Sequence, residues 1–115
     1  MATVAADGRP VTVATWYLLE DKDRVLLGLD AERARLKHMR TDPRVSLTVL
    51  SEGDWYTHVS VQGRVVSIVD DVGLRDIDRL ARHYTGQPYS NRERPRVSAQ
   101  VKVERWHVWG DFRDH

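Results

Sequence analysis

Cysteine is absent from the sequence. This absence excludes disulfide bonds, thiolate nucleophiles, iron–sulfur clusters and zinc sites with sulfur ligands. Any redox chemistry must therefore belong to a bound cofactor. The five histidines show no paired spacing of the kind that holds a metal ion, so we expect no metal site.

Long apolar runs are also missing. No segment approaches the roughly 20 apolar residues needed to span a bilayer, and no basic and then apolar leader precedes the first polar turn. We therefore expect a cytoplasmic protein that does not contact a membrane.

Neither sign of charge is in excess, because 18 Lys and Arg residues face 17 Asp and Glu residues and the net charge is +1. A balance of this kind argues against a dedicated nucleic-acid binder. The composition, with 41% hydrophobic and 30% charged residues in a chain of 115, is typical of one globular domain spanning 1–115. A domain of this size buries only about two thirds of its unfolded surface, so a partner subunit would add useful burial.

What the sequence does contain is a series of short alternating apolar segments. Asp7-Gly8 is a hairpin signal, because both central positions of such a turn favour positive φ. Gly63 and a change of phase near Glu104 predict bulges in the two longest segments. The strands predicted in this way cover residues 2–6, 11–19, 24–29, 44–50, 55–69 and 97–109.

Two further segments have helical periodicity. Asp30 can cap a helix over residues 31–41, and Pro43 disfavours helical geometry beyond it. Asp70-Asp71 begins a second helix whose apolar repeat continues to Tyr84. Six strands joined mainly by hairpins, with two inserted helices, predict a mainly β protein built as a small antiparallel barrel.

The first predicted helix is unusually basic. At 100° per residue, Arg33 and Lys37 share one stripe, whereas Arg35 points toward the more apolar side. A partly buried guanidinium needs an anionic or acceptor partner, and the N-terminus of a helix suits phosphate. Asp30 and Glu32 compete for the same donors, so these residues alone leave open both a solvated helix and an anion site.

Four tryptophans are many for so short a chain. Indole rings favour interfaces and ligand walls, because their N–H groups need partners. Packing within the barrel or a dimer is the simpler role for Trp16 and Trp106. Trp55 differs, because it follows the polar turn at 51–54, where a flat ring can line the site of a planar ligand.

Four stretches together resemble a known family. These are "RARLKHMRTDPRVSLTVL" (33–50), "DWYTHVSVQGRV" (54–65), "ATVAADGRPVT" (2–12) and "RLARHYTGQPY" (79–89). They resemble the split-barrel flavin and deazaflavin proteins related to pyridoxamine 5′-phosphate oxidase, and within them the actinobacterial group that binds the deazaflavin coenzyme F420. The resemblance implies a six-stranded antiparallel split β-barrel of the FMN-binding type.

The resemblance also implies roles for the basic helix. Members of the family commonly carry a basic residue, one intervening residue and a lysine here, which grip the phosphate of the coenzyme. Arg33, Ala34 and Arg35 match these positions, with arginine in place of the usual lysine, and Lys37 matches the next basic position, for the phosphate or an acidic tail. Around Leu29, where relatives often carry a phosphate-binding hydroxyl, this sequence has none and places the carboxylate of Asp30.

Further matches concern the ring of the coenzyme. Ala14, Thr15 and Trp16 match a strand whose backbone runs along the ring system, and Trp55 matches an aromatic residue of the pocket. Loop 92–96 would act as a mobile lid or as a clamp on an acidic tail. Most relatives also begin with a helix before the first strand, whereas this sequence begins inside that strand.

The function implied is that of a homodimeric oxidoreductase with its cofactor site at the subunit interface. Hydride would pass between F420 and a small electron-poor acceptor. Because the cofactor carries such chemistry, no catalytic residue is identified. The alternatives are an FMN-dependent reductase or oxidase, a non-catalytic module that binds flavin or haem, and a nucleic-acid binder, which the near-neutral charge opposes.

Overall fold

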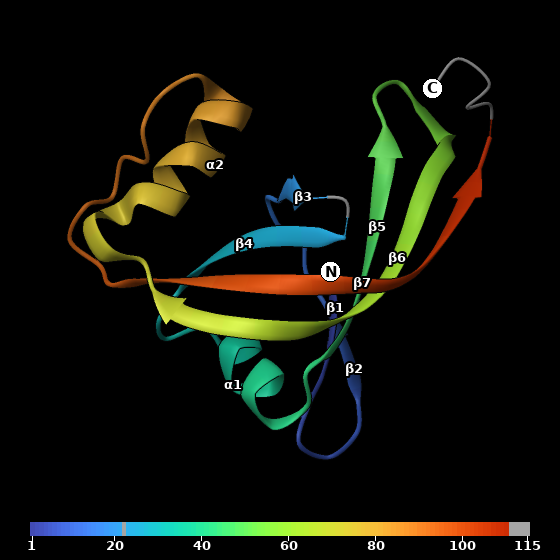
Figure 1. Ribbon diagram of the computed structural model, residues 1–115, viewed down its shortest axis with the longest axis horizontal. Coiled ribbons are helices and arrows are strands. Elements are labelled where there is room, and N and C mark those ends of the chain that lie inside the picture. The colour runs from blue at the N-terminus through green and yellow to red at the C-terminus, as the bar shows by residue number, and fades with distance from the viewer. Residues whose placement is uncertain (22, 111–115) are drawn as a thin grey trace.

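The computed structural model describes residues 1–21 and 23–110, apart from the side chain of Trp55. Within these residues, the strands form one antiparallel sheet in the order β2-β1-β5-β6-β7-β4-β3, and this sheet does not close (Figure 1). The sheet is that of an open split barrel. Its strands are β1 (Ala2–Val4), β2 (Pro10–Thr12), β3 (Leu18–Asp21), β4 (Arg24–Asp30), β5 (Arg44–Ser51), β6 (Asp54–Asp70) and β7 (Arg96–Trp109).

The predicted fold class is confirmed, with seven strands in the described residues instead of six. The difference arises because the strand expected over 11–19 was wrong in its middle, where residues 13–17 are irregular. Strand β2 pairs with β1 at one edge of the sheet, and β3 pairs with β4 at the other. The chain therefore crosses from one edge of the sheet to the other over residues 13–17. Alternation of apolar residues does not indicate which strand a segment pairs with, so the sequence pattern did not predict this crossing.

The first helix, α1 (Ala34–Thr41), ends just before Asp42 as predicted but begins three residues later than expected. Asp30 is not its cap, because Asp30 still pairs within the sheet as the last residue of β4. Its carboxylate accepts the backbone N–H of Glu32 at 3.0 Å, which closes the turn before the helix. Arg33 occupies the N-cap position, and no side chain bonds there.

The second helix, α2 (Arg75–Thr85), follows a single 3₁₀ turn, η1 (Val72–Leu74). Asp71 caps it, because its two carboxylate oxygens accept the backbone N–H groups of Asp76 at 2.9 Å and Ile77 at 2.8 Å. The acidic pair was therefore correctly predicted to start this helix, although the regular helix begins later. None of the described helices has the length and apolar character needed to cross a membrane.

The two helices pack on opposite sides of the sheet (Figure 1). On one side, α1 covers the barrel interior through Leu36 and Met39, which pack on alternate residues of β4 and β7. On the other side, α2 places Ile77 and Leu80 against Leu26 of β4. Strand β4 is thus covered on both faces, which explains its unbroken apolar sequence.

Both predicted bulge positions mark one irregularity between β6 and β7. Gln62 opposes Arg105 while Gly63 opposes Val103, so Glu104 is the extra residue of β7. A Cβ atom on Gly63 would lie only 2.3 Å from the backbone carbonyl oxygen of Lys102. Glycine is therefore required where the two long strands come this close together.

Replacing Gly63 by alanine should lower the free energy of unfolding by about 1–3 kcal/mol, the range for a side chain forced into packed surroundings. Urea denaturation followed by tryptophan fluorescence measures this change. Gln62→Ala, at the neighbouring exposed position, is the matched control and should leave the unfolding midpoint nearly unchanged. Equal midpoints for Gly63→Ala and the unaltered protein would contradict the proposed clash.

Candidate functional site

A cavity of about 300 Å³ opens between the irregular segment 13–17, the end of β4 and the start of α1. Five of the nine residues predicted to bind the cofactor line it, and they come from two distant parts of the sequence. The lining residues are Ala14, Thr15, Trp16, Gly28, Asp30, Arg33, Arg35, Tyr89 and Arg96.

The other predicted residues lie elsewhere. Leu29 is fully buried in the barrel core. Ala34 and Lys37 are exposed on α1 and do not line the cavity. The backbone of Trp55 belongs to β6, and its side chain lies outside the part of the structure that is described.

Four lining residues were absent from the predicted set, namely Gly28, Asp30, Tyr89 and Arg96. Arg96 reaches the site because it stands directly opposite Asp30 in the pairing of β4 with β7. The basic loop before β7 is visible in the sequence as a possible anion-binding segment. Only the strand order shows that this loop meets the end of β4 at Asp30.

The arginines give the cavity its electrostatic character. Arg35 is half-buried, and its Nη1 atom is buried without a hydrogen-bond partner among the described residues. Burial, and then the neighbouring charges of Arg33 and Arg96, lower the pKa of the Arg35 guanidinium, which nevertheless remains protonated. None of these three arginines forms an ion pair within the described residues. Such uncompensated positive charge favours an anionic ligand.

Arg96 is held in place by an aromatic residue. Its guanidinium lies 4.8 Å from the ring centre of Tyr89, and its Nη1 donates a hydrogen bond to the Tyr89 hydroxyl at 3.3 Å. The Nε atom of Arg96 is buried and has no partner among the described residues. Arg35 and Arg96, which both line the cavity, thus each have one buried donor without a partner among the described residues.

Trp16 provides a flat wall. Its ring stacks on Tyr84 with a centroid distance of 5.3 Å and an interplanar angle of 7°, and it meets the edge of Tyr89 at 6.5 Å. The Tyr84 hydroxyl accepts the backbone N–H of Tyr17 at 3.2 Å and lies 3.3 Å from its carbonyl oxygen. These contacts to α2 and its loop fix the segment that carries Ala14, Thr15 and Trp16.

The loop after α2 is tied down on two sides. Arg92 pairs with Asp78 of α2 at 2.6 Å. Arg94 reaches the other side, where its Nε lies 2.6 Å from Asp30 and its Nη2 lies 2.9 Å from Glu32. The backbone N–H of Glu32 lowers the pKa of Asp30, burial opposes this effect, and the charges of Arg94 and Arg96 lower the pKa further. This carboxylate is therefore ionised at neutral pH.

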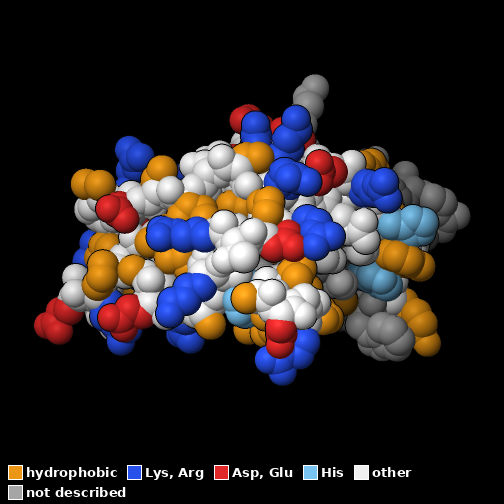
Figure 2. Space-filling view, turned by 90° about the horizontal axis from the view of Figure 1, so that it is seen from below, with side chains coloured by type: hydrophobic (Ala, Val, Ile, Leu, Met, Phe, Trp, Pro, Cys, Tyr) orange, Lys and Arg blue, Asp and Glu red, His pale blue; other side chains and the backbone are white. Residues whose placement is uncertain are grey.

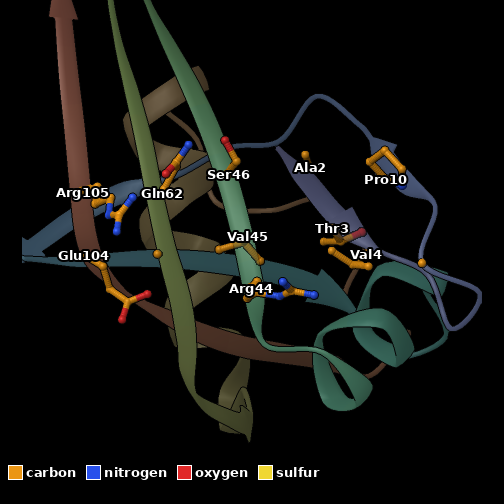
Figure 3. A pocket seen from close by; sticks show the side chains of 12 residues that line it. Ala2, Thr3, Val4, Pro10, Arg44, Val45, Ser46, Gln62, Glu104 and Arg105 are labelled. Carbon is orange, nitrogen blue, oxygen red and sulfur yellow. The ribbon is translucent and has the colours of Figure 1, made fainter.

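A larger cavity, of about 640 Å³, lies beside β1, β5 and the bulge of β7 (Figure 3). It contains none of the predicted residues. Its Arg44 is paired with Asp42 at 2.6 Å, and its Glu104 lies 3.9 Å from Arg64. The smaller cavity is the candidate site because it combines unpaired charge with an aromatic wall. Among the described residues, no group of three or more metal-ligating side chains is assembled.

Comparison with known families now bears on the site. Residues 1–110 match the family described as pyridoxamine 5′-phosphate oxidase. The chain belongs to this family. The match includes every residue that lines the candidate site.

Solved structures show the same fold as this pyridoxamine 5′-phosphate oxidase family member. One described as an F420 reductase superposes with a TM-score of 0.83 at 24% identity, covering 92% of this chain and 85% of that one. The conserved hypothetical protein Rv2991 from Mycobacterium tuberculosis gives 0.73 at 27% identity, with coverages of 94% and 73%. A putative pyridoxamine 5′-phosphate oxidase from Listeria innocua gives 0.67 at 14%, with coverages of 93% and 83%. No curated protein matches the sequence.

The family match agrees with the wider family that the sequence resembles. Membership of the family supports a flavin-type oxidoreductase function.

Arg35→Ala should weaken the binding of a phosphate-bearing coenzyme by about 1.5–3 kcal/mol, the range for hydrogen bonds to charged groups. Quenching of tryptophan fluorescence on titration with F420 or FMN reports the dissociation constant, because Trp16 lines the cavity. Arg40→Ala, which removes an exposed arginine of the same helix, is the control and should change binding little. Unchanged affinity in Arg35→Ala would remove this residue from the site.

Proposed function

We propose that this protein is an oxidoreductase that binds coenzyme F420 in the candidate site and transfers a hydride between it and a small electron-poor acceptor. One observation carries the proposal. Two half-buried arginines, each with one buried N–H group that has no partner among the described residues, line a cavity together with an exposed third arginine and a flat tryptophan. A ligand with a phosphate ester and a planar ring system would supply an anion for the arginines and a flat surface for Trp16.

The residues present fit the phosphate. Arg33 and Arg35 would hold it, since a guanidinium binds phosphate oxygens in a bidentate manner and arginine keeps the charge of the lysine usual in relatives. Lys37 is exposed one turn farther along α1, where it would meet a longer acidic tail. No serine or threonine hydroxyl is needed from the end of β4 if the arginines supply the donors.

The ring would lie along the segment that carries Ala14, Thr15 and Trp16. When bound, F420 supplies the hydride chemistry. The protein contributes orientation and shielding from water. Trp16, stacked on Tyr84, presents a rigid face to the ring, and Tyr89 from the loop after α2 forms another wall of the cavity. Trp55 is proposed as a second aromatic contact on the strength of the family resemblance.

A second copy of the chain would complete the site. An apolar hollow of about 280 Å³ lies along the open side of the barrel, lined by residues that include Leu19, Val61 and Trp106. Leu19 is 64% exposed and Trp106 is 69% exposed. Hydrophobic and histidine side chains also gather at the end of the molecule where β6 and β7 turn away from α2 (Figure 2). Proteins of this fold are commonly dimeric, and a two-fold dimer would cover this surface.

The decisive experiment is parallel titration of the purified protein with F420 and with FMN, followed by tryptophan fluorescence. We expect saturation at micromolar or lower F420 and weaker binding of FMN. Tighter binding of FMN would assign the protein to flavin-dependent reductases or oxidases instead. Binding of neither coenzyme would overturn the proposed function and leave the basic helix as a solvated surface.

The proposed dimer gives a separate prediction. Trp106→Glu places a charge on the apolar surface and should shift the protein from dimer to monomer in sedimentation velocity, because burying an unpaired carboxylate is costly. Val72→Glu is the matched control, since Val72 is 85% exposed but lies beside α2, away from the hollow. A Trp106→Glu variant that remains dimeric would exclude this surface as the interface.

A further inference from the structure

A second cavity adjoins the candidate site. Its volume is about 490 Å³, and it shares Asp30, Arg33, Tyr89 and Arg96 with the first. Glu32 and Arg94 also line it. Where the two cavities meet, the carboxylates of Asp30 and Glu32 therefore lie close to the arginines that would hold an anion. Their negative charge opposes anion binding unless it is neutralised.

Arg94 engages both carboxylates at once. Its Nε and Nη2 lie 2.6 Å and 3.3 Å from the two oxygens of Asp30, and Nη2 also lies 2.9 Å from Glu32. Asp30 is 7% exposed, so its charge is poorly screened by water. Arg94 itself does not line the first cavity.

The backbone fixes Arg94 in this position without a ligand. The N–H of Ala31 donates to the carbonyl oxygen of Pro95 at 3.2 Å, which ties the residue after Arg94 to the end of β4. The next residue, Arg96, opposes Asp30 in the pairing of β4 with β7. Arg94 and Arg96 therefore flank the same carboxylate, and each is a possible partner for it.

We propose that Arg94 is a positioning residue that occupies Asp30 and Glu32 and so keeps Arg33, Arg35 and Arg96 free for the phosphate of the ligand. This inference rests on the proposed function. Without Arg94, the nearby Arg96 is the strongest remaining partner for Asp30, and a carboxylate would then take the place of the phosphate. Arg94 thus acts by neutralising the negative charges of Asp30 and Glu32, without touching the ligand.

The test compares the affinities of Arg94→Gln, Asp30→Asn and the double variant for F420 and FMN by fluorescence titration. Arg94→Gln should weaken binding on the order of tenfold, the size expected for one unpaired negative charge near the ligand. Adding Asp30→Asn should restore the affinity to within about twofold of the unaltered protein.

A direct contact between Arg94 and the ligand predicts the opposite pattern. The double variant would then bind as weakly as Arg94→Gln, and this result would overturn the inference. Arg79→Gln is the matched control, since it removes a surface arginine paired with Glu20 at 2.8 Å outside both cavities. It should bind both coenzymes normally.

Thermal unfolding of each variant separates loss of fold from loss of binding. If Arg94→Gln alone fails to fold, the affinity of the double variant for the coenzymes is the test. Normal affinity supports the proposal that Arg94 neutralises the carboxylates, and weakened affinity overturns it. Absence of binding by the unaltered protein would instead refute the proposed function, so the two failures are distinguishable.

Discussion

Hydrogen bonds between β4 and β7 hold the candidate site together. This pairing sets Asp30 opposite Arg96 and brings the loop before β7 against the turn that leads into α1. It also joins β4, which contributes to the core under α1 and to the core under α2, to β7, which contributes to the core under α1. The positions of Asp30 and Arg96 at the cavity follow from this register, because a shift of one residue would turn each side chain to the opposite face.

The charges at the cavity are in mutual conflict without an anion. Burial disfavours the charged form of Arg35 most, and the charges of Arg33 and Arg96 add to the effect. A protein keeps such an arrangement only where the surrounding structure enforces it, and here the stacking of Tyr89 and the packing of β4 do so. An anionic ligand that relieves the repulsion would bind the folded state alone, and the fold would gain stability from it.

Much of this fold was predictable from local signals. The end of α1 at Asp42-Pro43, the start of the second helix at an acidic pair and the bulge at Gly63 each depend on a few neighbouring residues. The inward direction of Arg35 followed from helical periodicity alone. Other features depended on distant partners. Segment 13–17 leaves the sheet because its flanking strands pair at opposite edges, and Arg96 reaches the cavity only through β4.

The bulge at Glu104 has a consequence for assembly. Before it, odd-numbered residues of β7 such as Val101 face the barrel interior; after it, the even-numbered Trp106 continues the same face, opposite Val61 of β6. One inserted residue thus keeps a single apolar face along β7, with a buried part at Val101 that serves the protomer and an exposed part at Trp106. Since both parts share one ladder of hydrogen bonds with β6, the surface proposed for association is formed by the same pairing that completes the fold.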